Sequence, residues 1–315
     1  MIYKAYSSYR IAQLNFLLLI LPIVFSCKTT RNVANNTISE TTDTAPAKVL
    51  LVKPSDTDAA ITNADDPHYV SYHPNKKGKL FLFIPGTGGK AERGPKKLFE
   101  TALEAGYRLI NISYLNRPSV ARICRRDSLI KDPQCARHFR EKRIFGTGDF
   151  PWIPDQPQDA IAHRLTQLII HLNKIDREGS WGDFLTDQEE LRWDRIVATG
   201  QSQGGGMAAF IAQRKLVDKI ITFSGGWDKA SPRVLADWYA DKSVTPAERW
   251  YGTFHKLEPK ALDIEQSYHT LGIPPKNIFG LGLEIREGKK AHGEAIRNTI
   301  YTPLWKDLLG DGALD

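Results

Sequence analysis

The sequence predicts an α/β fold in which helices flank a mostly parallel sheet. From residue 79 onwards, short apolar segments alternate with helical patterns, which is typical of parallel strands joined by crossover helices. A second indication is the stretch 195–206, where an apolar strand runs into Gly-Gln-Ser-Gln-Gly and then into a helical pattern at 207–213. The 315 residues are enough for one such domain with a sizeable core.

The individual elements follow from hydrophobic periodicity. Segments 49–52 and 68–72 are candidate first strands, and 79–84 is the unbroken apolar run expected of a strand buried on both faces. Segment 158–172 carries an apolar stripe at helical spacing. The other predicted elements are helix 96–105, strand 108–113, strand 219–223, helix 231–239, strand 249–254, helix 262–271, strand 277–283 and helix 298–309.

The Gly-Gln-Ser-Gln-Gly stretch fills the pattern G-x-S-x-G with a strand before it and a helix after it. A strand that turns directly into a helix strains the backbone of Ser202 and exposes its hydroxyl, while Gly200 and Gly204 allow neighbouring backbone to approach. The helix would point free N–H groups at a developing oxyanion. A serine hydroxyl is a weak nucleophile, so a histidine base and an orienting acid must come from elsewhere.

The strand–serine–helix unit and the loop Pro-Gly-Thr-Gly-Gly at 85–89 resemble the α/β-hydrolase superfamily. The chain looks like a secreted bacterial serine esterase, and the resemblance covers nearly all of the chain after its N-terminal segment. It implies an α/β-hydrolase fold with a sheet of up to eight strands and hydrolysis of a carboxylic ester through an acyl-enzyme, without a cofactor. The substrate would be a small-molecule or polymer-borne ester. A serine peptidase is an alternative, because the fold does not fix the substrate.

The resemblance also implies positions for the oxyanion hole and the base. One N–H would come from the residue after the nucleophile, Gln203, and the other from Thr87 in the loop after the third strand. The base follows the acid in chain order and lies between the last strand and the last helix, which points to His292. His269, within a predicted helix, is a weaker candidate.

The acid has two main candidates and a third, more distant one. The end of the strand at 249–254 resembles the position of the family's acid and points to Glu258, although aspartate is commoner there. Asp228, which follows the strand at 219–223, is the alternative because some members place their acid after that strand. Asp263 is a more distant third choice. His255 could either be structural or line the site.

Segment 115–157 lies where α/β hydrolases commonly carry an insertion after strand 4. It contains Cys124 and Cys135, which would pair as a disulfide in an oxidising compartment, although two free buried thiols are the alternative. With its arginines, lysines and aromatic residues, the segment would form a disulfide-pinned rim that determines specificity. A surface excursion without any ligand role is equally compatible. No C-x-x-C motif or histidine cluster suggests a metal.

Residues 1–26 have the organisation of a signal peptide. Lys4 and Arg10 precede the apolar run at 16–25, which is short for a membrane span. Residues 24–27 resemble a bacterial lipobox, which implies cleavage before Cys27 and a lipid anchor on its thiol; an ordinary secretory signal is the alternative. We expect residues 27–47 to be a flexible tether and 48–315 to be an extracytoplasmic hydrolase domain, attached to the cell envelope by the anchor or otherwise secreted.

The charge pattern does not indicate a nucleic-acid partner. The net charge of the whole chain is +7, and loss of Lys4 and Arg10 with the signal peptide reduces it to +5. The basic residues are spread along the chain and form no basic helix or aromatic RNA motif. A ligand-binding lipoprotein that keeps the fold without catalysis is the second hypothesis. It would be favoured by loss of a triad member, but each triad role has a candidate.

Overall fold

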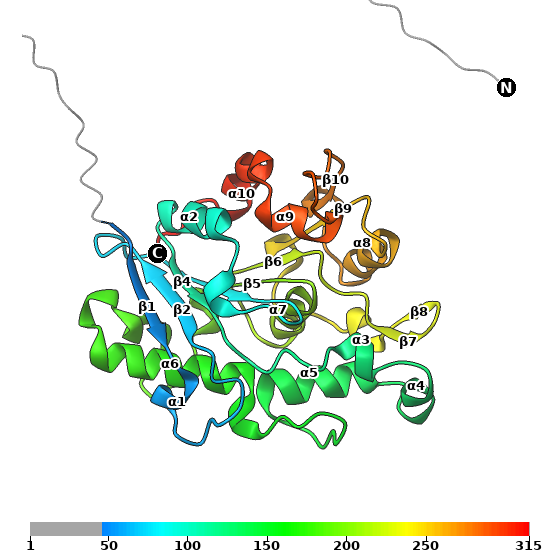
Figure 1. Ribbon diagram of the computed structural model, residues 1–315, viewed down its shortest axis with the longest axis horizontal. Helices are drawn as coiled ribbons and strands as arrows, with labels where there is room; N and C mark the ends of the chain where they lie inside the picture. Colours follow the sequence, from blue (N-terminus) through cyan, green and yellow to red (C-terminus); the bar gives the residue numbers. More distant parts are fainter. Residues whose placement is uncertain (1–45, 315) are drawn as a thin grey trace, which may run out of the picture. The chain divides into compact units, whose positions relative to one another are not determined.

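The computed structural model describes residues 46–314, and its centre is an eight-stranded sheet (Figure 1). The strand order is β1-β2-β4-β3-β5-β6-β9-β10. The strands from β4 to β10 in this order pair in parallel, whereas β2 pairs antiparallel with both β1 and β4. The predicted mostly parallel α/β-hydrolase sheet is therefore confirmed. The bounds are β1 (Lys48–Val52), β2 (His68–Tyr72), β3 (Leu80–Ile84), β4 (Arg108–Asn111), β5 (Ile196–Gln201), β6 (Lys219–Phe223), β9 (Trp250–His255) and β10 (Ile278–Leu281).

Helices cover both faces of this sheet because its central strands are apolar on both sides. In β3, Leu80, Leu82 and Ile84 face one core, while Phe81 and Phe83 face the other, as the two-residue period of a strand requires. The first core is closed by α6 (Ile161–Ile175), α7 (Gln203–Arg214) and α8 (Ala261–Thr270), and the second by α2 (Lys96–Glu104), α9 (Glu294–Arg297) and α10 (Thr302–Leu309). The short α1 (Pro54–Thr57) contacts α6.

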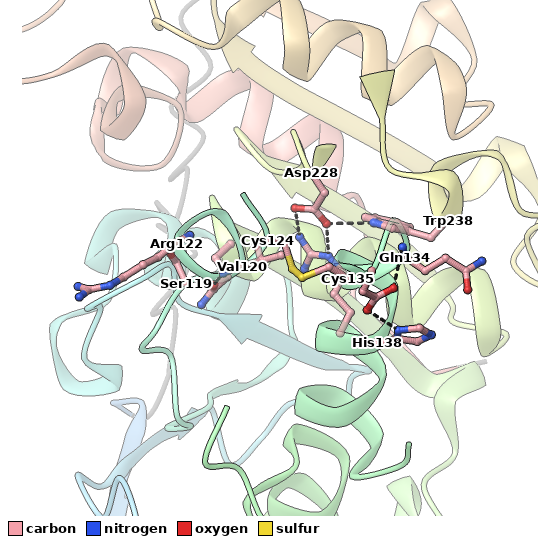
Figure 2. Close-up of a disulfide and its surroundings, with 12 residues drawn as sticks. Ser119, Val120, Arg122, Cys124, Gln134, Cys135, His138, Asp228 and Trp238 are labelled. Carbon is pink, nitrogen blue, oxygen red and sulfur yellow. Dashed lines mark hydrogen bonds and ion pairs between the residues drawn. A yellow bond between two sulfur atoms is a disulfide. The ribbon is translucent and has the colours of Figure 1, made fainter. Parts of the chain in front are cut away.

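The segment between β4 and α6 is an insertion with three helices, α3 (Val120–Ile123), α4 (Asp127–Lys131) and α5 (Cys135–Phe145). Cys124 and Cys135 form a disulfide with a Cα–Cα distance of 5.5 Å, which confirms the predicted pairing. Figure 2 shows this disulfide close to Asp228 and Trp238, which follow β6 in the chain. Phe139 of α5 is fully buried in the first core, so the insertion packs against the body of the domain.

The predicted helix at 231–239 is wrong. Residues 229–235 form a two-stranded hairpin, β7 (Lys229–Ser231) and β8 (Val234–Leu235), and a 3-10 turn follows at Asp237–Ala240. Pro232 lies between the two paired strands, where its fixed φ favours a turn. Other predicted elements are present with shifted ends: β4 stops at Asn111, β10 stops at Leu281, and α6 begins after a 3-10 turn at Pro157–Asp159. No helix within residues 46–314 is long and apolar enough to cross a membrane.

Candidate active site

Ser202 lies at the sharp turn between β5 and α7. Its backbone has φ 58° and ψ −124°, a strained conformation for a residue with a side chain. The turn is held by a 2.9 Å hydrogen bond from the Ser202 N–H to the carbonyl of Phe223. A methyl group on Gly204 would overlap the carbonyl of Ile84, and one on Gly200 would overlap the backbone of Gly204. The expected close approach of backbone at both glycines is therefore present.

Glu258 and His292 are in direct contact. The Oε2 atom of Glu258 lies 2.5 Å from Nδ1 of His292, although the two residues are 34 positions apart. The other oxygen, Oε1, accepts hydrogen bonds from the Ser224 hydroxyl at 2.6 Å and from the His255 N–H at 2.7 Å. The Glu258 side chain is only 1% exposed. Such a carboxylate can fix the orientation and tautomer of the imidazole.

Burial alone would raise the pKa of Glu258. The hydrogen bonds from His292, Ser224 and the His255 N–H act in the opposite direction and outweigh burial, so the pKa lies below its ordinary value. Glu258 is therefore an anion at neutral pH.

His292 lies in a 3-10 turn at Ala291–Gly293, after β10. Its carbonyl accepts a 3.0 Å hydrogen bond from Nε2 of Gln201, the residue before Ser202, and its ring has an edge contact with Trp227 at 5.7 Å between centroids. Because Nδ1 is bound to Glu258, Nε2 is the nitrogen left for proton transfer. The Ser202 hydroxyl has no hydrogen-bond partner among residues 46–314. In enzymes without bound substrate, the hydrogen bond between nucleophile and base is often long or absent and forms when substrate binds.

Asp228, the alternative acid, has different partners. Its carboxylate accepts two hydrogen bonds from Arg140, at 2.6 and 2.9 Å, and one from Nε1 of Trp238 at 3.0 Å. Both members of this ion pair are almost fully buried, with side chains 1% and 4% exposed. Asp228 therefore neutralises a buried arginine and makes no contact with His292. Asp263, the third choice, forms ion pairs with Lys229 and Lys260.

Thr87 and Gln203 lie with Ser202 around a small cavity of about 80 Å³. The N–H of Gln203 belongs to the first turn of α7, where backbone donors have no acceptor within the helix. The Gln203 side chain accepts from the Val120 N–H and donates to the Asn116 carbonyl, both at 2.9 Å. Asn116 in turn accepts from the Gly88 N–H at 3.0 Å. The insertion thus fixes both backbone segments that carry the candidate oxyanion donors.

A larger groove of about 620 Å³ adjoins this cavity. Four residues line both: Val120, Ala121, Trp227 and Asp228. The remainder of the groove is formed by Cys124, Arg125, Arg126, Leu129, Ile130, Lys229, Ala230, Ser231, Pro232 and Lys260. The groove therefore lies beside the cavity at Ser202 and shares part of its wall with it, and its remaining walls come from the disulfide-bonded insertion and the β7–β8 hairpin.

The remaining candidate histidines lie elsewhere. His255 is fully buried, its Nε2 lies 2.8 Å from the Leu283 carbonyl, and its Nδ1 accepts from the Leu257 N–H, so its ring is structural. His269 is exposed on α8. Within residues 46–314 no three side chains of histidine, cysteine, aspartate or glutamate gather in a way that could hold a metal ion. The proposed lipid-anchor residue, Cys27, lies outside the described residues.

Sequence reasoning missed several residues that support the site. Ser224 donates to Glu258, Gln201 holds the turn of His292, Asn116 fixes the loop at 85–89, and Arg140 pairs with Asp228. The sequence contained one usable signal, since Gln201 and Gln203 flank the serine and polar side chains at such a buried turn require partners. The partners themselves are distant in the chain and leave no local pattern.

Comparison with known proteins gives likenesses of low identity. No family model and no curated protein matches the chain. Among solved structures, S-formylglutathione hydrolase FrmB from Staphylococcus aureus is 11% identical, with 85% of this chain and 98% of that chain covered and a TM-score of 0.48. The bacterial heroin esterase is 14% identical, with coverages of 84% and 83% and a TM-score of 0.44. The carboxylesterase EstE1 from a metagenomic library is 11% identical, with coverages of 86% and 90% and a TM-score of 0.43. Likenesses at this level decide neither activity nor substrate.

Proposed function

We propose that this protein is a serine hydrolase that cleaves a carboxylic ester through an acyl-enzyme intermediate. The observation that carries the proposal is the Glu258–His292 hydrogen bond, which Gln201 links to the strand-to-helix turn that carries the strained Ser202. A nucleophile, a base and an orienting carboxylate are the parts that acyl transfer requires. No cofactor enters the reaction.

In the first half-reaction, Oγ of Ser202 attacks the ester carbonyl carbon while Nε2 of His292 takes the hydroxyl proton. The carbonyl oxygen becomes an oxyanion, which accepts hydrogen bonds from the N–H groups of Gln203 and Thr87. The C–O bond to the alcohol then breaks, and His292 gives its proton to the departing alkoxide. Glu258 remains ionised and stabilises the imidazolium throughout.

In the second half-reaction, water takes the place of the alcohol. His292 removes a proton from the water, and the resulting hydroxide attacks the acyl carbon. The second oxyanion uses the same two N–H donors. Collapse of this intermediate releases the carboxylic acid and returns the proton to Ser202, so the enzyme is regenerated without net change.

We further propose that the chain is exported and anchored through Cys27. The basic start and apolar run of residues 1–26 support export, and the resemblance of residues 24–27 to a lipobox supports the anchor. The Cys124–Cys135 disulfide is consistent with this, because disulfides persist in oxidising compartments outside the cytoplasm. Incorporation of labelled palmitate into the parent protein, and its loss in Cys27→Ser, is the direct test of the anchor.

Turnover of short-chain p-nitrophenyl esters tests the hydrolase proposal. We expect turnover in the parent protein, its loss in Ser202→Ala, and a fall of several orders of magnitude in His292→Ala. Ser55→Ala is a matched control, because Ser55 is bound to Asp65 and does not line the cavity at Ser202. A folded parent that hydrolyses no ester, or a Ser202→Ala variant that keeps its turnover, contradicts the proposal.

A further inference from the structure

We propose that the groove beside Ser202 selects esters in which an apolar chain ends in an anionic group, such as a carboxylate. The apolar chain would lie along the groove and the anion would meet a cationic rim formed by Arg125 and Arg126. This inference rests on the proposed hydrolase function and names the substrate class for the same site.

The position of the groove makes it a substrate subsite. It shares Val120, Ala121, Trp227 and Asp228 with the cavity at Ser202, and we expect a chain attached to the reacting carbonyl to extend into it. Trp227 also contacts the ring of His292, which places the entrance of the groove next to the candidate base. Its volume of about 620 Å³ lies within the usual range for small-molecule sites.

The walls of the groove are suited to a hydrocarbon chain. Leu129, Ile130, Ala230 and Pro232 lie along it beyond the shared residues, and Ile130 is 81% exposed. A hydrocarbon chain that lies in the groove would remove these apolar side chains from water together.

The charge of the groove is positive and only partly compensated. Four cations line it: Arg125, Arg126, Lys229 and Lys260. Asp263 binds both lysines, at 2.6 and 3.2 Å, so one carboxylate serves two ammonium groups. The single acid in the lining, Asp228, is already neutralised by Arg140. The groove therefore keeps an excess of three positive charges.

The two arginines have no hydrogen-bond or ion-pair partner for their guanidinium groups within residues 46–314. Both are exposed and follow Cys124, in the short loop that the disulfide closes. Arg126 has φ 47°, which is strained for a residue other than glycine or asparagine. The disulfide and the strained backbone thus constrain the loop that carries these two unpaired arginines. An anionic ligand in the groove would supply the counter-charge that they lack.

Matched substrates test the proposal. The first pair consists of p-nitrophenyl half-esters of straight-chain dicarboxylic acids and the same compounds with the far carboxyl capped as a primary amide. The second pair consists of acetates of ω-hydroxycarboxylic acids and of their amides, with release of acetic acid followed by titration. The first pair places the charge in the acyl half and the second in the alcohol half, and a series of chain lengths is measured for each.

We expect kcat/KM to favour the anionic member of one pair by about tenfold at low salt, the effect of one hydrogen bond to a charged group. The preference should fall below about threefold in Arg125→Ala/Arg126→Ala, and it should shrink when salt is raised. Lys77→Ala/Lys174→Ala is the control, because it removes two exposed cations that do not line the groove, and it should keep the full preference.

Equal kcat/KM for anionic and capped esters in both pairs overturns the proposal while the hydrolase function stands. If no ester is hydrolysed, binding of suberic acid monomethyl ester and of its amide to Ser202→Ala, measured by calorimetry, still decides the question. Salt-sensitive preference for the acid supports an anion-binding groove, and equal binding refutes it. Binding to vesicles with anionic phosphatidylglycerol that is lost in the double arginine variant, without any preference between esters, would assign the rim to a membrane surface instead.

Discussion

A pair of isosteric substitutions distinguishes between the two candidate acids, Glu258 and Asp228. Glu258→Gln removes the charge that faces His292, and Asp228→Asn removes the charge that faces Arg140. Because the partners differ, we expect the first substitution to abolish turnover with little loss of stability. The second should reduce stability and leave much of the turnover of the folded protein.

The magnitudes follow from the contacts. A glutamine at 258 can present its N–H₂ group to Nδ1 of His292, which stabilises the wrong tautomer, and such a change lowers kcat by on the order of 10⁴-fold. Its oxygen can still accept from Ser224 and from the backbone, so we expect about 1–2 kcal/mol of lost stability. Asp228→Asn leaves a buried arginine without its counter-charge, which typically costs about 3–5 kcal/mol.

The assay combines ester turnover with chemical unfolding of the same preparations. In the folded protein, hydrogen bonds stabilise the ionised form of Glu258 and lower its pKa. The resulting contribution to stability is present above the ordinary pKa of 4.5 and is lost as pH falls through the lower pKa of the folded state. The stability difference between the parent and Glu258→Gln should therefore shrink in acid. An active Glu258→Gln beside a stable but inactive Asp228→Asn would refute the assignment.

Three further changes have expected outcomes. Cys124→Ser/Cys135→Ser should lower the unfolding free energy by about 3 kcal/mol in the chain-entropy model, and unchanged denaturant midpoints would contradict this. Gly204→Ala, compared with Gly282→Ala, where the methyl group would make only an ordinary contact with the Lys256 side chain, should lower both soluble yield and turnover because the methyl group meets the Ile84 carbonyl. Burial lowers the pKa of His68 to about 3, so between pH 6.5 and that value this group should lower stability by up to about 1.4 kcal/mol per pH unit, and above about pH 5, where carboxylates contribute little, the slope should be clearly smaller in His68→Phe.

Local patterns were sufficient for the sheet and for the turn at Ser202. The run at 79–84 is apolar at every position because both faces of β3 are buried, and the glycines at 200 and 204 stand where backbone segments touch. Both features leave a pattern in consecutive residues, so the sequence displays them directly.

Long-range pairing could not be predicted in the same way. The choice between Glu258 and Asp228 depends on Arg140, which lies 88 residues before Asp228 and neutralises it. The wrong helix at 231–239 has a similar origin. Val234, Leu235, Trp238 and Tyr239 have helical spacing in the sequence, but the two aromatic residues are buried against distant elements and Pro232 lies at the hairpin turn. The helices of the insertion were missed because α4 has no buried residue and α5 buries arginines in ion pairs.

The most direct test of the proposed mechanism is to locate the covalent adduct formed with a fluorophosphonate. The parent protein should gain one phosphonyl group, and peptide mapping should place it on Ser202, with labelling slowed strongly in His292→Ala. A protein that is folded but gains no adduct, or an adduct on another serine, would contradict the assignment of Ser202 as nucleophile and with it the proposed acyl-enzyme.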